Sequence, residues 1–184
     1  MIYNVFIPLA ISGEHSQYVN GRARDSIMQQ RDYDNKNLKP VITTYATEGE
    51  INSQRNITER RLGKLENIPG EAGSRNLCRD AAVSCAEYLC IMQDRDVVHL
   101  NVYNYGDMHK YMLDNPLCGA VSIKHTHGCG SVDIGCMMWR VSVLQQISFI
   151  NVYGTCLCKE TCEQITKLGF TVNYLDNLTR IMEV

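Results

Sequence analysis

The sequence lacks the features that mark membrane, secreted and nucleic-acid-binding proteins. No apolar run reaches membrane-spanning length, and residues 1–4 show none of the charged and apolar regions of a signal peptide. We therefore expect a cytoplasmic protein without a membrane span. The 18 basic and 20 acidic side chains leave a net charge of only −2, which argues against a dominant nucleic-acid surface.

Internal repeats and low-complexity segments are also absent. The chain has 184 residues, of which 45% are hydrophobic and 21% are charged. These proportions are ordinary for a globular protein, and the length suits one domain with a full core. We expect residues 1–184 to form a single domain.

Cysteine is abundant, with nine residues, but no two of them form a Cys-x-x-Cys pair. Four lie in apolar segments, where we expect them to pack as small hydrophobic side chains: Cys78, Cys85, Cys90 and Cys118. The others gather later in the chain, near His125 and His127: Cys129, Cys136, Cys156, Cys158 and Cys162. A structural zinc site and free thiols are both open here, and the spacing, which matches none of the common zinc patterns, favours free thiols.

Apolar strands alternate with amphipathic helices along the chain. We predict strands over residues 2–8, 38–45, 64–68, 87–92, 118–123 and 170–175. We predict helices over residues 16–30, 70–86, 105–114 and 156–168, the last capped by Gly169. The remaining segments are predicted as a loop with a solvated helix (46–63), a glycine-rich loop (124–135) and a strand or short helix (136–147). This alternation indicates an α/β fold with a mostly parallel central sheet flanked by helices.

Two carboxylates, Asp94 and Asp96, follow the predicted strand 87–92 at its carboxyl end. Two close negative charges after a buried strand repel each other, unless a cation compensates them. Hard cations such as Mg²⁺ and Mn²⁺ use such carboxylate oxygens, and open α/β sheets bind ligands at the carboxyl ends of their strands. The alternative is a polar turn without a ligand, because Asp also favours turns.

Four stretches together resemble, in order and spacing, a family-2-type glycosyltransferase with the GT-A fold. Residues 5–10 (VFIPLA) resemble the first strand with its proline, and residues 18–33 (YVNGRARDSIMQQRDY) the first helix. Residues 72–96 (AGSRNLCRDAAVSCAEYLCIMQDRD) follow the family pattern of glycine, Arg-Asn, a small-residue helix and a strand ending in Asp-x-Asp. Residues 134–149 (IGCMMWRVSVLQQISF) resemble the later glycine and arginine segment. The resemblance extends to about residue 175.

This resemblance implies a transferase that moves a sugar from a nucleotide-diphosphate donor to an acceptor hydroxyl. It implies Mn²⁺ or Mg²⁺ as cofactor, because a Lewis acid stabilises the charge of the leaving nucleotide diphosphate. Asp96 is then the direct metal ligand, while Asp94 contacts the ribose or supports the metal through water. His127, with His125 as the other candidate, completes the metal shell or lines the acceptor site. The alternative for both histidines is an exposed loop position without a ligand.

The nucleotide contacts that the resemblance implies include Pro8, Arg75 and Asn76. The last two serve equally well as polar groups at a helix N-terminus. The family usually has an acidic residue after its second strand, and this sequence does not match it. Either Glu48 substitutes for that acid, or base recognition differs, for instance by stacking on Tyr45.

The catalytic base is a second departure from the family. An inverting transferase needs a carboxylate near the acceptor hydroxyl, and in the family it heads the late helix. Counting back about three helical turns from Gly169 reaches Leu157 and Cys158, neither of which is such a base. Glu160 is the nearest carboxylate and Asp133 is its rival, although acids favour first helical turns without any catalytic role.

Two other functions stay open at this point. A nucleotidyltransferase also uses nucleotide phosphates and metal, but it requires a glycine-rich, basic phosphate loop near the N-terminus. Residues 9–15 contain one glycine and no lysine or arginine, which disfavours this function. A binding module that kept the nucleotide-sugar fold and lost its base is the other alternative, and the unmatched acidic residues favour it.

Overall fold

The computed structural model describes residues 2–8, 21–32, 34–36, 38–44, 59–61, 70–94, 97–123, 128–175 and 181–183. None of the helices in these ranges has the length and apolar character needed to cross a membrane. The predicted strand 64–68 lies outside the described residues.

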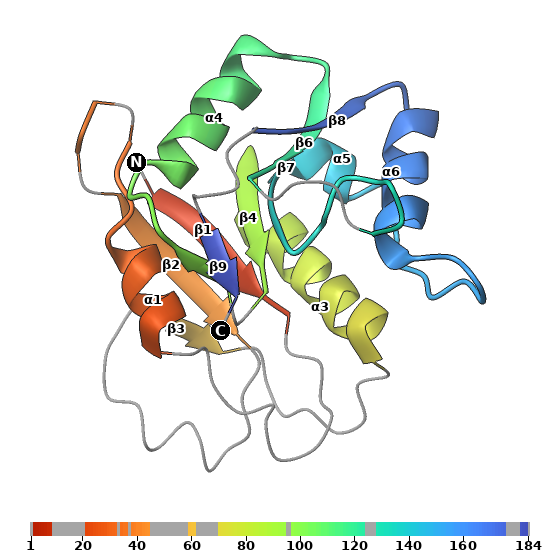
Figure 1. Ribbon diagram of the computed structural model, residues 1–184, viewed down its shortest axis with the longest axis horizontal. Coiled ribbons are helices and arrows are strands. Elements are labelled where there is room, and N and C mark those ends of the chain that lie inside the picture. Colours follow the sequence, from red (N-terminus) through yellow and green to blue (C-terminus); the bar gives the residue numbers. More distant parts are fainter. Residues whose placement is uncertain are drawn as a thin grey trace.

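The fold centres on a seven-stranded sheet in the order β3-β2-β1-β4-β7-β6-β8 (Figure 1). In chain order, its strands are β1 (Ile2–Ile7), β2 (Lys39–Thr44), β3 (Glu59–Arg61), β4 (Leu89–Gln93), β6 (Cys118–Ser122), β7 (Cys136–Arg140) and β8 (Thr171–Tyr174). All neighbouring strands are parallel except at β7, which runs antiparallel to both β4 and β6. The prediction of an α/β fold with a mostly parallel sheet is confirmed.

Helices flank this sheet: α1 (Gly21–Met28), α3 (Gly70–Cys85), α4 (Asn104–Asp114), α5 (Val141–Leu144) and α6 (Leu157–Lys167). α1 packs on β2 and α4 on β6 and β7, whereas α3 packs on β1 and α5, and α6 packs on β8. A small second sheet pairs β5 (Val97–His99) with β9 (Ile181–Glu183) in antiparallel register. β1 and β4 each contain three consecutive buried apolar residues, 5–7 and 90–92, because both faces of these strands are covered.

Most predicted elements are confirmed to within a few residues. The first helix begins at Gly21, and residues 16–20 of its predicted range lie outside the described part of the chain. Residues 136–147 contain both predicted alternatives, since β7 leads directly into α5. β3 lies inside the segment predicted as a loop and solvated helix, so that part of the prediction is wrong. β3, β5 and β9 are three residues long, which is too short for a period-2 pattern to emerge.

All nine cysteines are free thiols. Cys78, Cys90 and Cys118 are buried as predicted, but Cys85 is exposed, and that prediction is wrong. The buried stripe of α3 runs through Cys78 and Ala82 to Ala86 at four-residue intervals, so Cys85 lies outside it. The Cys85 thiol donates instead to the carbonyl of Ala81 in the preceding turn, with the two atoms 3.0 Å apart.

The amino end of β4 is tied to its neighbours by a buried arginine, Arg140. Its Nε donates to the Cys118 carbonyl at 2.7 Å, and its Nη2 donates to the carbonyls of Met112 at 2.6 Å and Asn115 at 3.1 Å. Its Nη1 donates to the Tyr88 hydroxyl, and the guanidinium lies over the Tyr88 ring, 5.4 Å from the centroid. The cation therefore joins β7, β6 and the last turn of α4, where the carbonyls at the carboxyl end of a helix attract positive charge.

Candidate functional site

The candidate site lies where several chain segments meet at the carboxyl end of β4. Because β1, β2 and β4 are parallel, their carboxyl ends share one edge of the sheet (Figure 1). Pro8 follows β1 there, buried, and Asp94 follows β4. β7, which is antiparallel, begins at the same edge, with Cys136 opposite Gln93.

Arg75 and Asp94 form an ion pair at this edge. The Arg75 side chain is only 2% exposed, and its Nη2 lies 2.6 Å from Oδ1 of Asp94, whose side chain is 32% exposed. The Nε atom of Arg75 donates to Oε1 of Glu71 at 3.0 Å, and the Nη1 atom of Arg75 donates to the carbonyl of Ile134 at 3.3 Å. Burial alone would lower the pKa of Arg75, but the charges of Asp94 and Glu71 outweigh burial, so the pKa is raised. The site therefore holds a permanent, oriented cation.

The last residues of the glycine-rich loop are hydrogen-bonded to Asp94. The Asp94 amide donates to the carbonyl of Gly135 at 2.7 Å, and the Gly135 amide donates to Oδ1 of Asp133 at 2.6 Å. Asp133 is buried. The structure thus brings together three residues that the sequence analysis singled out: Arg75, Asp94 and Asp133.

The N-terminal turn of α6 lies against this loop segment. The Cys162 thiol is 3.7 Å from the carbonyl of Val132, and the Cys158 thiol bonds the backbone of Ile134. Burial raises the pKa of Cys158 to about 12, the bond to Ile134 opposes the shift, and the charge of Asp133 adds to it. These thiols are therefore protonated and unreactive at neutral pH.

Glu160 lies in the first turn of α6, as predicted, and is half-buried. Its Oε1 accepts a hydrogen bond from Nε2 of Gln164, with the two atoms 3.4 Å apart. Gln164 is itself bound to both backbone groups of Ser148. The structure therefore places the carboxylate of Glu160 on the α6 face that meets the loop after α5.

Asn76 has a clear structural contact. Its Nδ2 donates to the carbonyl of Phe149 at 2.7 Å, and its Oδ1 accepts from the amide of the same residue at 2.9 Å. The side chain thus pins the loop after α5 to α3. Its predicted contact with the nucleotide stays a prediction.

The remaining predicted site residues, Glu48, Asp96 and His127, lie outside the described residues, as do Tyr45 and His125. Within the described ranges, no three His, Cys, Asp or Glu side chains are arranged to hold a metal ion. The described part of the site thus offers Asp94 as a carboxylate, and the predicted metal site depends on the residues outside it.

A buried polar network that was not predicted from the sequence surrounds Gln93, the residue directly before Asp94. Gln93 and His99 are its centre, joined by a 2.6 Å contact between Oε1 and Nε2. Tyr105 and Asn104 of α4 bind to them. Burial lowers the pKa of His99 to about 3, so the imidazole is neutral. A glutamine as the last residue of an otherwise apolar strand was the signal that could have revealed the network.

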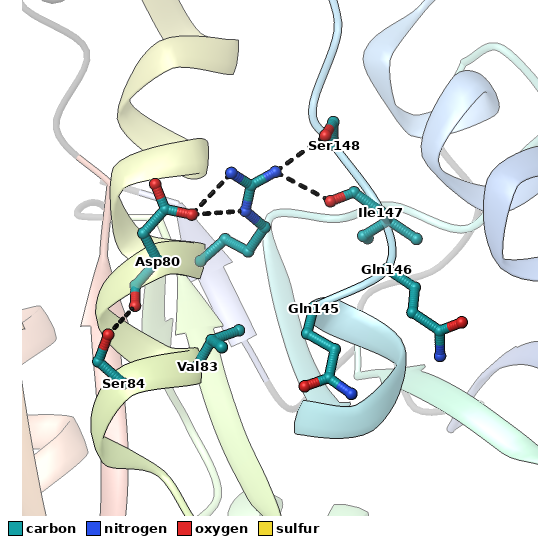
Figure 2. A pocket seen from close by; sticks show the side chains of 8 residues that line it. Asp80, Val83, Ser84, Gln145, Gln146, Ile147 and Ser148 are labelled. Atoms are coloured by element: carbon teal, nitrogen blue, oxygen red, sulfur yellow. Dashed lines mark hydrogen bonds and ion pairs between the residues drawn. The ribbon is translucent and has the colours of Figure 1, made fainter.

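A separate groove of about 380 Å³ lies between α3 and the segment after α5 (Figure 2). The Arg79 guanidinium crosses the groove. On one side it donates hydrogen bonds to Oδ1 of Asp80, and on the other side it donates to the carbonyl of Ile147 and the hydroxyl of Ser148. None of the predicted site residues lines this groove. Its arginine is fully engaged in holding the two walls together.

No protein-family model and no curated protein sequence matches this chain. Solved structures do match in fold. A mannosyltransferase from Pyrobaculum calidifontis, in complex with GDP-Man and Mn²⁺, superposes with a TM-score of 0.64 at 14% identity, over 96% of this chain and 55% of the other. S. aureus TarS 1-349 superposes with a TM-score of 0.60 at 14% identity, over 98% of this chain and 60% of the other, and is also known in complex with UDP-GlcNAc.

The chain has a GT-A-like fold. A Bacillus anthracis protein described as a glucose-1-phosphate thymidylyltransferase also shares this GT-A-like architecture, with a TM-score of 0.60 at 8% identity, over 96% of this chain and 87% of the other. The chain spans little more than half the length of the mannosyltransferase and TarS structures and most of the thymidylyltransferase. The candidate site lies at the carboxyl edge of the GT-A-like sheet.

Proposed function

We propose that this chain is a metal-dependent, inverting glycosyltransferase of the family-2 type, which moves a sugar from a nucleotide-diphosphate donor to an acceptor hydroxyl. The observation that carries the proposal is the ion pair of Arg75 with Asp94 at the carboxyl end of β4. GT-A-like structures of similar fold bind GDP-Man with Mn²⁺ and UDP-GlcNAc. The site therefore combines a suitable fold with an oriented carboxylate in the place where α/β sheets bind ligands.

The donor set suits a hard divalent cation. Asp94 is partly exposed, and Asp96 follows two residues later in the sequence, so the segment supplies two carboxylates. Carboxylate oxygens are the ligands that Mn²⁺ and Mg²⁺ prefer. We assign direct ligation to Asp96, with His127 completing the shell, because Arg75 already engages Oδ1 of Asp94. Bound there, the metal would act as a Lewis acid toward the nucleotide diphosphate.

The other residues orient the two substrates. Arg75 fixes Asp94, whose carboxylate would contact the ribose or support the metal through water. Pro8, Glu48 and Asn76 are assigned to the nucleotide as the resemblance implies. Glu160 is the preferred base, because Oδ1 of Asp133 already accepts from the backbone of Gly135 and the residue is buried. The base must reach the acceptor hydroxyl from which it removes the proton.

Calorimetric titration with UDP and GDP, with Mn²⁺ and then with EDTA, tests the proposal. We expect binding that EDTA weakens by at least about tenfold, the lower end of the losses that follow when a metal site is disturbed. Asp96→Ala should lose the part of the nucleotide affinity that depends on the metal. Asp114→Ala is the matched control, because Asp114 is exposed on α4 and pairs with Lys110. If Asp96→Ala binds as tightly as the unmodified protein with Mn²⁺ present, the metal site is wrongly assigned.

One observation favours a second candidate function, a nucleotidyltransferase. The chain spans 87% of the thymidylyltransferase-like structure, against 55% of the mannosyltransferase. The absence of lysine and arginine from residues 9–15 argues against it, because such enzymes need a basic phosphate loop there. Pyrophosphate release from a nucleoside triphosphate and a sugar 1-phosphate would identify this activity, whereas hydrolysis or transfer of a nucleotide-sugar would identify the glycosyltransferase. Nucleotide-sugar binding without turnover would indicate a binding module.

A further inference from the structure

Gln93 is a fully buried polar side chain at the last position of β4, directly before Asp94. A buried amide without partners is costly, so its hydrogen bonds define what it does. The turn that follows has the sequence Asp94-Arg95-Asp96 and contains no apolar side chain that could anchor it in the core. The described residues on either side of Arg95 and Asp96 are joined by a hydrogen bond from the Val97 amide to the Asp94 carbonyl.

The Oε1 atom of Gln93 accepts from three donors on three different elements. These are Nε2 of His99 in β5 at 2.6 Å, the hydroxyl of Tyr105 in α4 at 2.8 Å and the thiol of Cys136 in β7 at 3.5 Å. Asn104 donates from Nδ2 to Nδ1 of His99 at 2.8 Å. That contact places the imidazole proton on Nε2, where it points at Gln93.

Two of the donors are themselves held in place by α1 and by Gln30, two residues after its end. The amide of His99 donates to the hydroxyl of Ser26 at 3.0 Å, and the amide of Tyr105 donates to Oε1 of Gln30 at 3.1 Å. The rings of His99 and Tyr105 also meet edge to face, with centroids 4.8 Å apart. The carboxamide of Gln93 is thus oriented by a rigid, buried surround.

The other end of the same carboxamide closes the turn. Nε2 of Gln93 donates to the carbonyl of Val97 at 3.0 Å, and the amide of Val97 donates to the carbonyl of Asp94 at 3.2 Å. The Asp94 amide is bound to Gly135 on the other side. Because the carbonyl of Val97 can only accept and the three groups at Oε1 can all donate, the two ends of the amide cannot be exchanged.

We propose that Gln93 is a positioning residue that clamps Val97 to Asp94 and thereby fixes the Asp94 carboxylate at the metal and nucleotide site. The clamp consists of the bond from Gln93 to Val97 and the bond from Val97 to Asp94, while the three donors keep the amide from rotating. The link to metal and nucleotide rests on the proposed function. The clamp itself rests on the contacts of Gln93 alone.

Hydrogen exchange and nucleotide binding test the two parts separately. Gln93→Met keeps the length of the side chain and removes both polar ends, and Tyr105→Phe removes one donor and keeps the packing. The matched control is Gln146→Met, the same substitution at an exposed glutamine whose Nε2 donates to the carbonyl of Ser142 at 2.7 Å, away from the turn. Exchange is measured at the Val97 amide and at amides of the β4–β7 ladder, and affinity for UDP and GDP is measured by calorimetry with Mn²⁺ and with EDTA.

In Gln93→Met we expect exchange of the Val97 amide to rise about tenfold or more, while ladder amides stay within a factor of about three, because local opening is independent of the sheet. Metal-dependent affinity should fall about tenfold, and affinity in EDTA should not change, a split that a general loss of stability would not produce. Tyr105→Phe should shift both quantities in the same direction by less, and this variant decides the test if Gln93→Met does not fold. The control should resemble the unmodified protein.

Unchanged exchange at Val97 in the folded variants would overturn the clamp. Faster exchange with unchanged metal-dependent affinity would overturn its role at the site. If the unmodified protein binds no nucleotide in any condition, the proposed function fails, and the exchange at Val97 still decides whether Gln93 clamps the turn.

Discussion

Arg75 and Asn76 are adjacent on α3, yet their side chains hold different parts of the molecule. Arg75 reaches the end of β4 and pairs with Asp94, while Asn76 binds both backbone groups of Phe149. Replacing Arg75 by lysine would not be conservative, because its three nitrogens contact three different partners in a fixed fork. The adjacent Arg-Asn pair of the sequence motif thus has two separate roles: Arg75 fixes Asp94, and Asn76 holds the segment at Phe149.

Glu160 is the residue whose predicted role is easiest to isolate. If it removes the acceptor proton, Glu160→Gln should lower turnover by about 10²–10⁴, the usual contribution of a general base. Donor affinity should stay nearly constant, because the base acts on the acceptor. Steady-state rates and calorimetry with the nucleotide-sugar measure the two quantities.

Glu163→Gln is the control for this measurement. Glu163 is exposed on the same helix, and its substitution removes the same charge as Glu160→Gln. Equal turnover in Glu160→Gln and the unmodified protein would exclude Glu160. The same substitution series would then move to Asp133.

At the scale of elements, the long apolar strands and the helices were predictable because their periods repeat several times. The Asp-x-Asp turn was predictable because a charged pair contrasts with the strand before it. The network around Gln93 was not predicted: the glutamine at the end of an apolar strand was a signal, but its histidine and tyrosine partners look like ordinary polar surface residues in a linear sequence. They meet because β5 and α4 bring His99 and Tyr105 within hydrogen-bond distance of Gln93 in the folded chain.

Arg140 connects β7, β6 and α4 and provides a test at the same scale. Arg140→Met should lower the free energy of unfolding by about 3 kcal/mol, because it leaves buried carbonyls without a donor. Arg140→Lys should recover only part of this loss, since an ammonium cannot satisfy acceptors on three elements at once. Urea denaturation measures both.

Arg22→Met, at an exposed position of α1, is the control and should change stability by less than about 0.5 kcal/mol. An equally small loss of unfolding free energy in Arg140→Met would mean that water replaces the guanidinium as donor to these carbonyls. Arg140 would then not stabilise the contact between β7, β6 and α4.

At the scale of the whole molecule, the neutral state of His99 makes stability depend on pH. Burial lowers the pKa of His99 from an ordinary 6.5 to about 3 in the folded protein. The unfolded chain therefore binds a proton between these values that the folded chain does not bind. Stability contributed by the neutral imidazole is complete above pH 6.5 and falls by about 1.4 kcal/mol per unit as the pH drops toward 3.

Denaturation curves for the unmodified protein and for His99→Gln between pH 7 and pH 4.5 isolate this contribution. We expect the free energy of unfolding to depend less steeply on pH in His99→Gln, by a slope that corresponds to nearly one proton. His109, whose pKa burial also lowers, is present in both proteins and cancels in the comparison. Parallel curves would mean that His99 is protonated in the folded state.

The antiparallel strand β7 links the site to the order in which the sheet can assemble. β7 pairs with β6 over a separation of about twenty residues (Ala120 with Trp139), but with β4 over about fifty (Leu89 with Arg140). Closing the shorter loop costs less entropy, so the β6–β7 ribbon can form first and dock on β4 afterwards. Ile134 and Gly135, which hold Arg75 and Asp94, directly precede β7 and arrive with it. Completion of the sheet and assembly of the site are therefore one event, and a folding intermediate that lacks the β4–β7 ladder has no site at all.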